Sequence, residues 1–178
     1  MFTEAQQRSL IAVAREAVRG AVIGAPPPVP APMDLPPASG AFVTLKKHGE
    51  LRGCIGTLEC RRSLAEEVAR VAVSAAREDP RFAPVGPSEL DDLDLEVSVL
   101  GPLEQIDPAD PEAIVLGRHG LVVEQGSRRG LLLPQVATEW NMDRETFLAH
   151  TCAKAHLPAD AWRKGATVYR FGAEVFAG

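Results

Sequence analysis

A proline-rich segment divides this chain into two parts with different patterns. Residues 24–40 read GAPPPVPAPMDLPPASG, and proline fixes φ and lacks a backbone N–H donor. Such a segment excludes both a helix and a central strand, so we predict a semi-rigid surface connection. Before it, Thr3 and Gln6 form a capping-box pattern that opens an amphipathic helix over residues 3–22. After it, residues 41–178 are expected to form the main body.

The composition is that of an ordinary globular protein. A chain of 178 residues, 46% hydrophobic and 24% charged, can bury a core and fits a single domain over residues 1–178. The net charge of −5 and the 5% aromatic content disfavour nucleic acid as a partner, which needs basic and stacking surfaces. No run is apolar enough to span a membrane, and the N-terminus lacks a signal-peptide pattern. Three cysteines without a CxxC pair predict a cytoplasmic protein with neither a disulfide framework nor a zinc site. We expect no cofactor.

The main body mixes strand and helix patterns. We expect a strand at 42–47 and a returning strand at 51–59, joined by a turn. Residues 93–100, LDLEVSVL, alternate apolar and polar side chains as a one-sided strand does. Further expected elements are a helix that opens at Ser63 and stops before Asp79, a hairpin of 121–124 and 131–133, a helix capped by Asp143, and a C-terminal strand over 169–175. Strands joined mostly by turns predict an α+β fold with a largely antiparallel sheet and packed helices.

Cys54 lies in an unusual setting, LRGCIGTLE, between Gly53 and Gly56 and two residues after Arg52. In a regular strand Arg52 and Cys54 would share one face, and a nearby guanidinium favours the reactive thiolate. Glycines let a ligand or another backbone approach the main chain. Arg52 and the main chain from Gly53 to Thr57 could therefore form a small patch that binds anions and presents a thiol. The alternative is structural: a strand glycine often marks a bulge, which would break the shared face, and free cysteine is usually buried.

Other candidate groups have weaker patterns. His119, in GRHGL, could act as a general base toward Cys54, but a solvated turn histidine is the simpler interpretation. The four histidines form no HxH or HExxH pattern, so we predict no metal site. The sequence has no glycine-rich phosphate loop and no Ser-His-Asp signature. It does not decide whether the protein is an enzyme.

Six blocks occur in order along the chain: LRGCIGTL, DPRFAPV (79–85), ELDDLDLEVSVL (89–100), GRHGLVV (117–123), GLLLPQVA (130–137) and FLAHTCAKAHLPADAW (147–162). Together they resemble the AMMECR domain family, known in bacteria and archaea as AmmeMemoRadiSam system protein A. The resemblance runs from about Phe42 to Phe176. The chain departs from the family pattern at His156, where a glycine is typical, and at Asn141-Met142, where Gly-Trp is common. A glycine after a helix usually adopts the left-handed conformation, so the turn at His156 is of interest.

The resemblance implies a larger and a smaller lobe around a cleft that the LRGCIG segment helps to line. It also implies that Arg81, His119, Gln135 and Lys154 surround the Cys54 patch. Three of these residues have a simple structural alternative as well, since Arg81 could cap the preceding helix, Gln135 could hold a turn and Lys154 could be solvated. As partners the resemblance implies a Memo-like protein, related to ring-cleaving dioxygenases, and a radical-SAM protein. It attaches no reaction to the family.

Two hypotheses follow from the sequence. The favoured one is an accessory or ligand-binding module whose cleft binds a small anionic ligand or a segment of a partner. It is favoured because the glycine-flanked Arg52 is accompanied by no acid/base set. The alternative is a cysteine-dependent enzyme with Cys54 as nucleophile or redox thiol, Arg52 as anion clamp and His119 as base.

Overall fold

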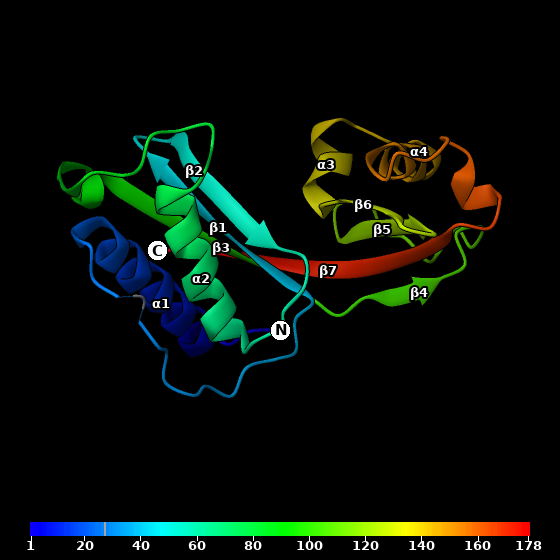
Figure 1. The fold of residues 1–178 in the computed structure, drawn as a ribbon. Helices are drawn as coiled ribbons and strands as arrows, with labels where there is room; N and C mark the ends of the chain where they lie inside the picture. Colours follow the sequence, from blue (N-terminus) through cyan, green and yellow to red (C-terminus); the bar gives the residue numbers. More distant parts are fainter. Residues whose placement is uncertain (27) are drawn as a thin grey trace. The chain divides into compact units, whose positions relative to one another are not determined.

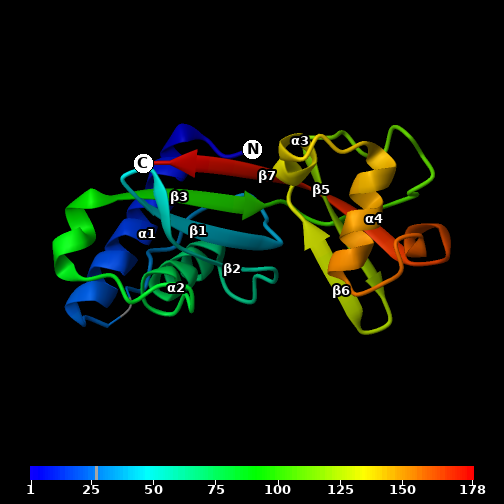
Figure 2. The same ribbon diagram turned by 90° about the horizontal axis from the view of Figure 1, so that it is seen from above.

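The computed structural model describes residues 1–26 and 28–178 (Figures 1 and 2). In chain order its elements are α1 (Glu4–Ile23), β1 (Gly40–Lys47), β2 (Glu50–Thr57), α2 (Leu64–Arg77), the 3₁₀ helix η1 (Pro87–Asp92), β3 (Leu93–Leu100), β4 (Glu104–Ile106), β5 (His119–Gln125), β6 (Arg128–Leu132), α3 (Pro134–Glu139), α4 (Arg144–Lys154), the 3₁₀ helix η2 (Ala161–Arg163) and β7 (Thr167–Ala177). In that part of the chain, no helix is both long and apolar enough to cross a membrane.

The chain divides into two compact units. The first unit comprises residues 1–100 and 174–178, and the second unit comprises residues 101–173. Strands hydrogen-bond in the order β2-β1-β3-β7-β5-β6, with β4 also paired to β7. The pairs β1–β2, β1–β3, β4–β7, β5–β6 and β5–β7 are antiparallel. The predicted α+β class with a largely antiparallel sheet is therefore confirmed.

The proline-rich connection behaves as its composition predicts where the structure describes it. Helix α1 ends at Gly24, which adopts a left-handed φ of 80°. Residues 28–38 form neither helix nor strand, and β1 begins at Gly40. Pro27, which belongs to the predicted connection, lies outside the described residues.

In the first unit, α1 and α2 cover one face of the sheet (Figures 1 and 2). Both helices begin with the predicted capping box, at Thr3 with Gln6 and at Ser63 with Glu66. The strand side chains that face them are fully or almost fully buried: Ala41, Val43 and Leu45 of β1, and Leu95, Val97 and Val99 of β3. The alternation predicted for residues 93–100 is confirmed, because it places one apolar row against the helices.

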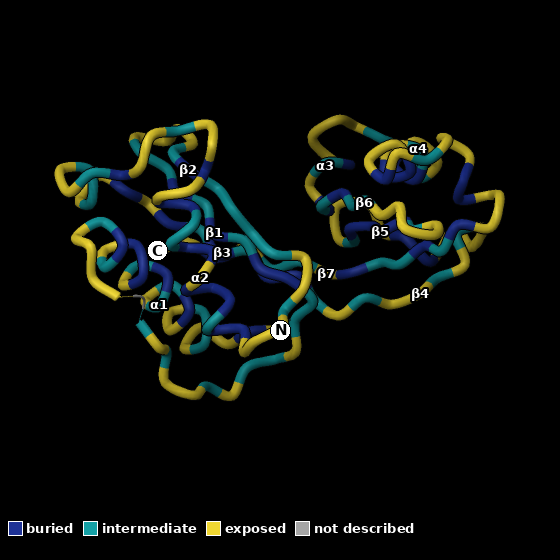
Figure 3. Tube along the Cα trace, in the orientation of Figure 1, coloured by how far each residue is buried: buried dark blue, intermediate teal, exposed yellow. Residues whose placement is uncertain are grey.

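Among the described residues of the first unit, both α1 and α2 lie on that face, and neither covers the opposite face (Figures 1 and 2). It carries the alternate residues of the same strands, which are half-buried: Phe42, Thr44 and Lys46 of β1, Cys54 of β2, and Glu96 and Ser98 of β3. We call these six residues the open face. Figure 3 shows the corresponding difference along the chain, with β1 and β3 alternating in burial and β2 mostly intermediate.

The second unit has a small core of its own. Helix α4 is capped by Asp143, whose Oδ1 accepts from the Thr146 N–H at 2.7 Å, as predicted. The helix buries Phe147, Leu148 and Cys152 completely. They pack in one cluster with apolar residues of β5 and β7, among them Leu121, Val123 and Val168.

Both departures from the family pattern fall on left-handed turns. His156 has a φ of 59° and Asn141 a φ of 48°. A residue with a side chain is strained in this region, although asparagine and histidine tolerate it better than most. A glycine, which the resemblance implies at both places, would adopt this conformation without strain.

Helix α2 approaches β2 very closely at Gly53. A Cβ atom on Gly53 would lie 2.3 Å from the backbone carbonyl oxygen of Ala75 in α2. A Cβ atom on Gly56 would meet the Phe42 ring at 2.2 Å. Both glycines therefore leave room for neighbouring groups of the protein itself, which is one of the two roles that the sequence allowed.

We predict that Gly53→Ala lowers the free energy of unfolding by about 1–3 kcal/mol, because the added methyl must displace helix backbone rather than a flexible side chain. Urea denaturation followed by circular dichroism measures the change. The control is Gly86→Ala, since a Cβ atom at Gly86 meets nothing within 4 Å and should change stability by less than about 0.5 kcal/mol. Equal stability of the Gly53→Ala variant and the wild type would contradict this packing.

Candidate functional site

The backbone of Cys54 is held by two side chains that follow α2. The Cys54 N–H donates to Asp79 Oδ2 at 3.0 Å, and Arg81 Nη2 donates to the Cys54 carbonyl oxygen at 3.4 Å. Asp79 and Arg81 also bind each other, with Arg81 Nη2 2.7 Å from Oδ2 and Nε 3.0 Å from Oδ1. We call this pair the Asp79–Arg81 clamp. Because β2 is the last strand in the sheet order, the clamp occupies backbone groups that would otherwise be open at an edge.

Both side chains of the clamp are held in their charged forms. Asp79 is only 4% exposed, and the hydrogen bond from the Arg81 side chain holds the pKa of its carboxyl far below the usual range. Burial acts in the opposite direction, and the N–H groups of Cys54 and Arg81 lower the pKa further. The same hydrogen bond raises the pKa of the Arg81 guanidinium, and attraction to Cys54 acts in the same direction. A fixed carboxylate and a fixed guanidinium therefore lie beside Cys54.

Arg52 belongs to a cluster next to the clamp. Its Nε donates to Glu89 Oε2 at 3.1 Å, and its Nη2 lies 3.0 Å from the same oxygen in an ion pair. The Cζ atoms of Arg52 and Arg81 lie 5.9 and 5.5 Å from the centre of the Phe82 ring, within cation–π range. The structure thus brings Arg52, Cys54 and Arg81 into one region around Phe82.

Of the two interpretations of β2, a regular strand or a strand with a bulge, the structure shows the bulge, at Arg52 rather than at Gly53. Leu45 lies opposite Gly53 and Lys46 opposite Leu51, so Arg52 is an extra residue without a partner on β1. Such a β-bulge adds one residue to the strand, so the side chains before it no longer alternate in step with those after it. The shared face of Arg52 and Cys54 therefore does not follow from the strand, and the guanidinium electrostatically coupled to Cys54 is that of Arg81.

The Cys54 thiol lies in a polar row on the open face. Its Sγ is 3.2 Å from Thr44 Oγ1, and either atom can donate. Glu96 is the register partner of Thr44 on the other side, and Glu96 Oε2 is 2.5 Å from Lys46 Nζ. The hydrogen bond to Glu96, together with the attraction between the two charges, raises the pKa of Lys46. The row Cys54–Thr44–Glu96 thus combines a thiol, a hydroxyl and an ion-paired carboxylate.

Thr57, the other residue predicted to bind a ligand in this strand, ends β2. Its Oγ1 donates to the Glu59 carbonyl oxygen at 2.8 Å and accepts from the Glu59 N–H at 3.2 Å. The hydroxyl therefore closes the turn after the strand. A ligand role for Gly53, Gly56 and Thr57 stays a prediction.

The remaining predicted site residues belong to the second unit. His119 is the first residue of β5, and its Nδ1 accepts from the Val115 N–H at 3.0 Å. Burial lowers the pKa of this half-buried ring, and Arg170 and Arg118 act in the same direction. Gln135 is exposed in the first turn of α3, and Lys154 is exposed at the end of α4. That these three residues surround Cys54 stays a prediction.

Several residues of the site carried no signal in the sequence. Asp79 was expected only to mark the end of a helix, and Thr44, Glu89 and Glu96 lie in ordinary strand or charged contexts. The block DPRF did point to Arg81, through the family resemblance. In the described part of the chain, no group of three or more His, Cys, Asp or Glu residues could hold a metal ion.

Comparison with known proteins identifies the family. The family model AMMECR1 matches residues 11–176. A Methanothermobacter thermautotrophicus protein is 50% identical over 178 residues, which cover 95% of this chain and 92% of that protein. A Thermococcus kodakarensis protein is 49% identical over 159 residues, which cover 84% of this chain and 78% of that protein. The crystal structure of an uncharacterised Pyrococcus horikoshii protein matches with a TM-score of 0.77 and 44% identity, over 94% of this chain and 89% of that chain. The chain belongs to the AMMECR1 family, as its sequence blocks predicted.

We predict that Asp79→Asn lowers the free energy of unfolding by about 1.5–3 kcal/mol at neutral pH. The reason is that a neutral amide replaces the carboxylate that accepts the hydrogen bonds from Arg81 and from the Cys54 N–H. Folding lowers the pKa of Asp79, so its contribution is complete above the unfolded pKa of about 3.9 and is lost as the pH falls below it. Urea denaturation of both proteins between neutral pH and pH 3 measures the difference.

The matched control is Asp91→Asn, an exposed aspartate of η1 in the same unit. It should change stability by less than about 0.5 kcal/mol. A difference between wild type and Asp79→Asn that stayed constant down to pH 3 would contradict the electrostatic origin of the effect.

Proposed function

We propose that this AMMECR1-family protein is an accessory, ligand-binding module and that the open face around Cys54 is its binding surface. The observation that carries the proposal is the pairing of the charged groups on this face and at the neighbouring edge of β2. Asp79 is bound to Arg81, Arg52 to Glu89 and Lys46 to Glu96. The polar group in contact with the thiol is the Thr44 hydroxyl, which is not a base that takes up the thiol proton at neutral pH.

The chemistry of this region suits a small anionic ligand or an extended segment of a partner. Arg81 has a side chain that is 55% exposed, and its fork offers N–H donors beyond those used by Asp79. Phe42 adds an aromatic surface beside the polar row of the open face. We assign the anion-binding role to Arg81 rather than to Arg52, whose side chain is 14% exposed and paired with Glu89.

The proposed partners are a Memo-like protein and a radical-SAM protein in the cytoplasm. They are the partners that the family resemblance implies. An accessory role is consistent with a surface that offers a thiol, a hydroxyl and paired charges but no assembled catalytic set.

The alternative function is a cysteine-dependent enzyme with Cys54 as nucleophile or redox thiol. One observation favours it: Arg81 Nη2 donates to the Cys54 carbonyl oxygen at 3.4 Å, so a guanidinium that could bind an anionic substrate lies next to this cysteine. Full activity of a Cys54→Ser variant in an assay of the protein with its partners would exclude this alternative.

We predict that Thr44→Arg weakens binding of the Memo-like or the radical-SAM partner by roughly tenfold or more, because a long charged side chain in the middle of the open face blocks close approach. Isothermal titration calorimetry with each purified partner measures the affinity.

The control is Ala12→Arg, which adds the same side chain at an exposed position of α1 and should leave the affinity unchanged. Circular dichroism checks that both variants are folded. Equal binding by the folded Thr44→Arg variant and the wild type would rule out the open face as the binding surface.

A further inference from the structure

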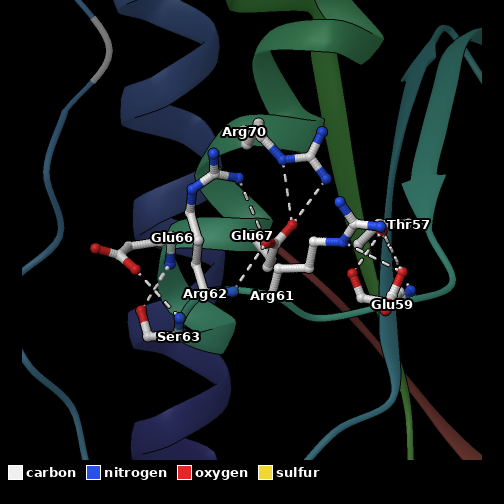
Figure 4. A network of polar contacts seen from close by, with 8 residues as sticks. All are labelled: Thr57, Glu59, Arg61, Arg62, Ser63, Glu66, Glu67 and Arg70. Carbon is white, nitrogen blue, oxygen red and sulfur yellow. Dashed lines mark hydrogen bonds and ion pairs between the residues drawn. The ribbon is translucent and has the colours of Figure 1, made fainter.

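A polar cavity lies in the first unit where β2 leads into α2. Its volume is about 470 Å³, and its lining consists of Thr57, Glu59, Arg61, Arg62, Glu67 and Arg70. We call it the arginine pocket, and Figure 4 shows its side chains with their polar contacts. All of these lining residues are polar or charged, which is unlike the mostly apolar lining of common small-molecule sites. The pocket therefore suits a polar, charged ligand.

The arginine pocket is separate from the open face. Along β2, Gly53 faces α2 and Ile55 packs against the helix-side core. Side chains two residues apart in a strand point to the same face, so Thr57 lies on the helix side with Gly53 and Ile55. Cys54 lies on the opposite face. An inference about the arginine pocket thus does not rest on the function proposed for the Cys54 region.

Glu67 is the fixed centre of the pocket. Its side chain is 1% exposed, and its Oε2 accepts from Arg70 Nε at 3.2 Å and Nη2 at 2.8 Å. Its Oε1 accepts from the Arg62 N–H at 3.2 Å. Burial alone would raise the pKa of this carboxyl, but the bonds from Arg70 and from the backbone outweigh burial and lower it. Glu67 is therefore an anchored carboxylate that orients Arg70.

The other two arginines are held more loosely. Arg62 Nη1 lies 3.6 Å from Glu67 Oε1, which is longer than a hydrogen bond, and its side chain is 58% exposed. Arg61 binds Glu59 through Nε and Nη2 at 3.2 and 3.0 Å, but its side chain is 78% exposed, and exposed pairs of this kind contribute little. Both side chains can turn toward a stronger anion.

The charges of the pocket do not balance. Three arginines against two glutamates leave an excess of one positive charge. Each guanidinium carries five N–H donors, so three of them offer more donors than two carboxylates accept. The excess of charge and of donors favours an added anion.

We propose that the arginine pocket binds the phosphate group of a small molecule. A tetrahedral phosphate accepts hydrogen bonds from several guanidinium forks at once, whereas a planar carboxylate is matched by one fork. Glu67 and Glu59 position the forks. The cavity is also larger than a phosphate group alone requires, which leaves space for the organic part of a phosphate ester.

The test uses the full chain and inorganic phosphate as the probe, at low ionic strength. Two-dimensional NMR of the arginine side-chain Nε–Hε groups reports binding at individual arginines. We expect saturable shifts at Arg61, Arg62 and Arg70, and an affinity that falls as salt is added. Arg61→Gln and Arg62→Gln should each weaken phosphate binding by roughly tenfold, because each removes a charged donor. Arg77→Gln, an exposed arginine in the last turn of α2, is the matched control and should bind as the wild type does.

Three outcomes would overturn the proposal. The first is the absence of saturable phosphate binding by the folded wild type, and the second is equal binding by the wild type and both pocket variants. The third is binding of acetate as tight as that of phosphate at equal ionic strength, which would refute the phosphate assignment. Arg61 and Arg62 are exposed, so their variants should fold, and circular dichroism verifies this.

Discussion

The surroundings of Cys54 depend on the bonds between the Asp79–Arg81 clamp and the backbone of β2. An edge strand normally leaves N–H and carbonyl groups open to other chains, and at Cys54 both groups are bound by these two side chains. A buried carboxylate is costly unless it is fully paired, and here Arg81 and two N–H groups pair it. The clamp therefore performs two tasks at once. It fixes the edge of the sheet, and it places a guanidinium against the Cys54 carbonyl group.

The two faces of the first unit's sheet have different physical roles. On the helix side the constraint is space, and Gly53 is required because the α2 backbone lies where its side chain would be. On the open face the constraint is charge, and Lys46 with Glu96 forms an ion pair in the row next to Cys54. Gly53 of LRGCIG thus gives room to the α2 backbone, and Gly56 gives room to the Phe42 ring on the open face, the face on which Cys54 lies. This division explains how one short segment contributes to stability and presents a thiol.

Local sequence patterns predicted the helices and strands more successfully than they predicted the contacts between distant residues. The helix starts at Thr3 and Ser63 were predictable, because capping involves residues three positions apart. A bulge next to Gly53 was an open alternative, but its place at Arg52 was not predictable, since it depends on the register with β1. The short strand β4 and helix α3 were too brief to produce a period. Asp79 was recognised as a helix stop but not as part of the site, because its bond to Cys54 joins residues that only the fold brings together.

Hydrogen exchange at the Cys54 amide tests the clamp most directly. Amides at the edge of a sheet exchange rapidly unless a partner holds them. We predict that the Cys54 amide of the wild type exchanges as slowly as the amides of the central strand β1, and that Asp79→Ala accelerates it by at least roughly tenfold, the effect of losing one charged hydrogen bond. Rapid exchange at Cys54 in the folded wild type would contradict the clamp and the placement of Arg81 that follows from it.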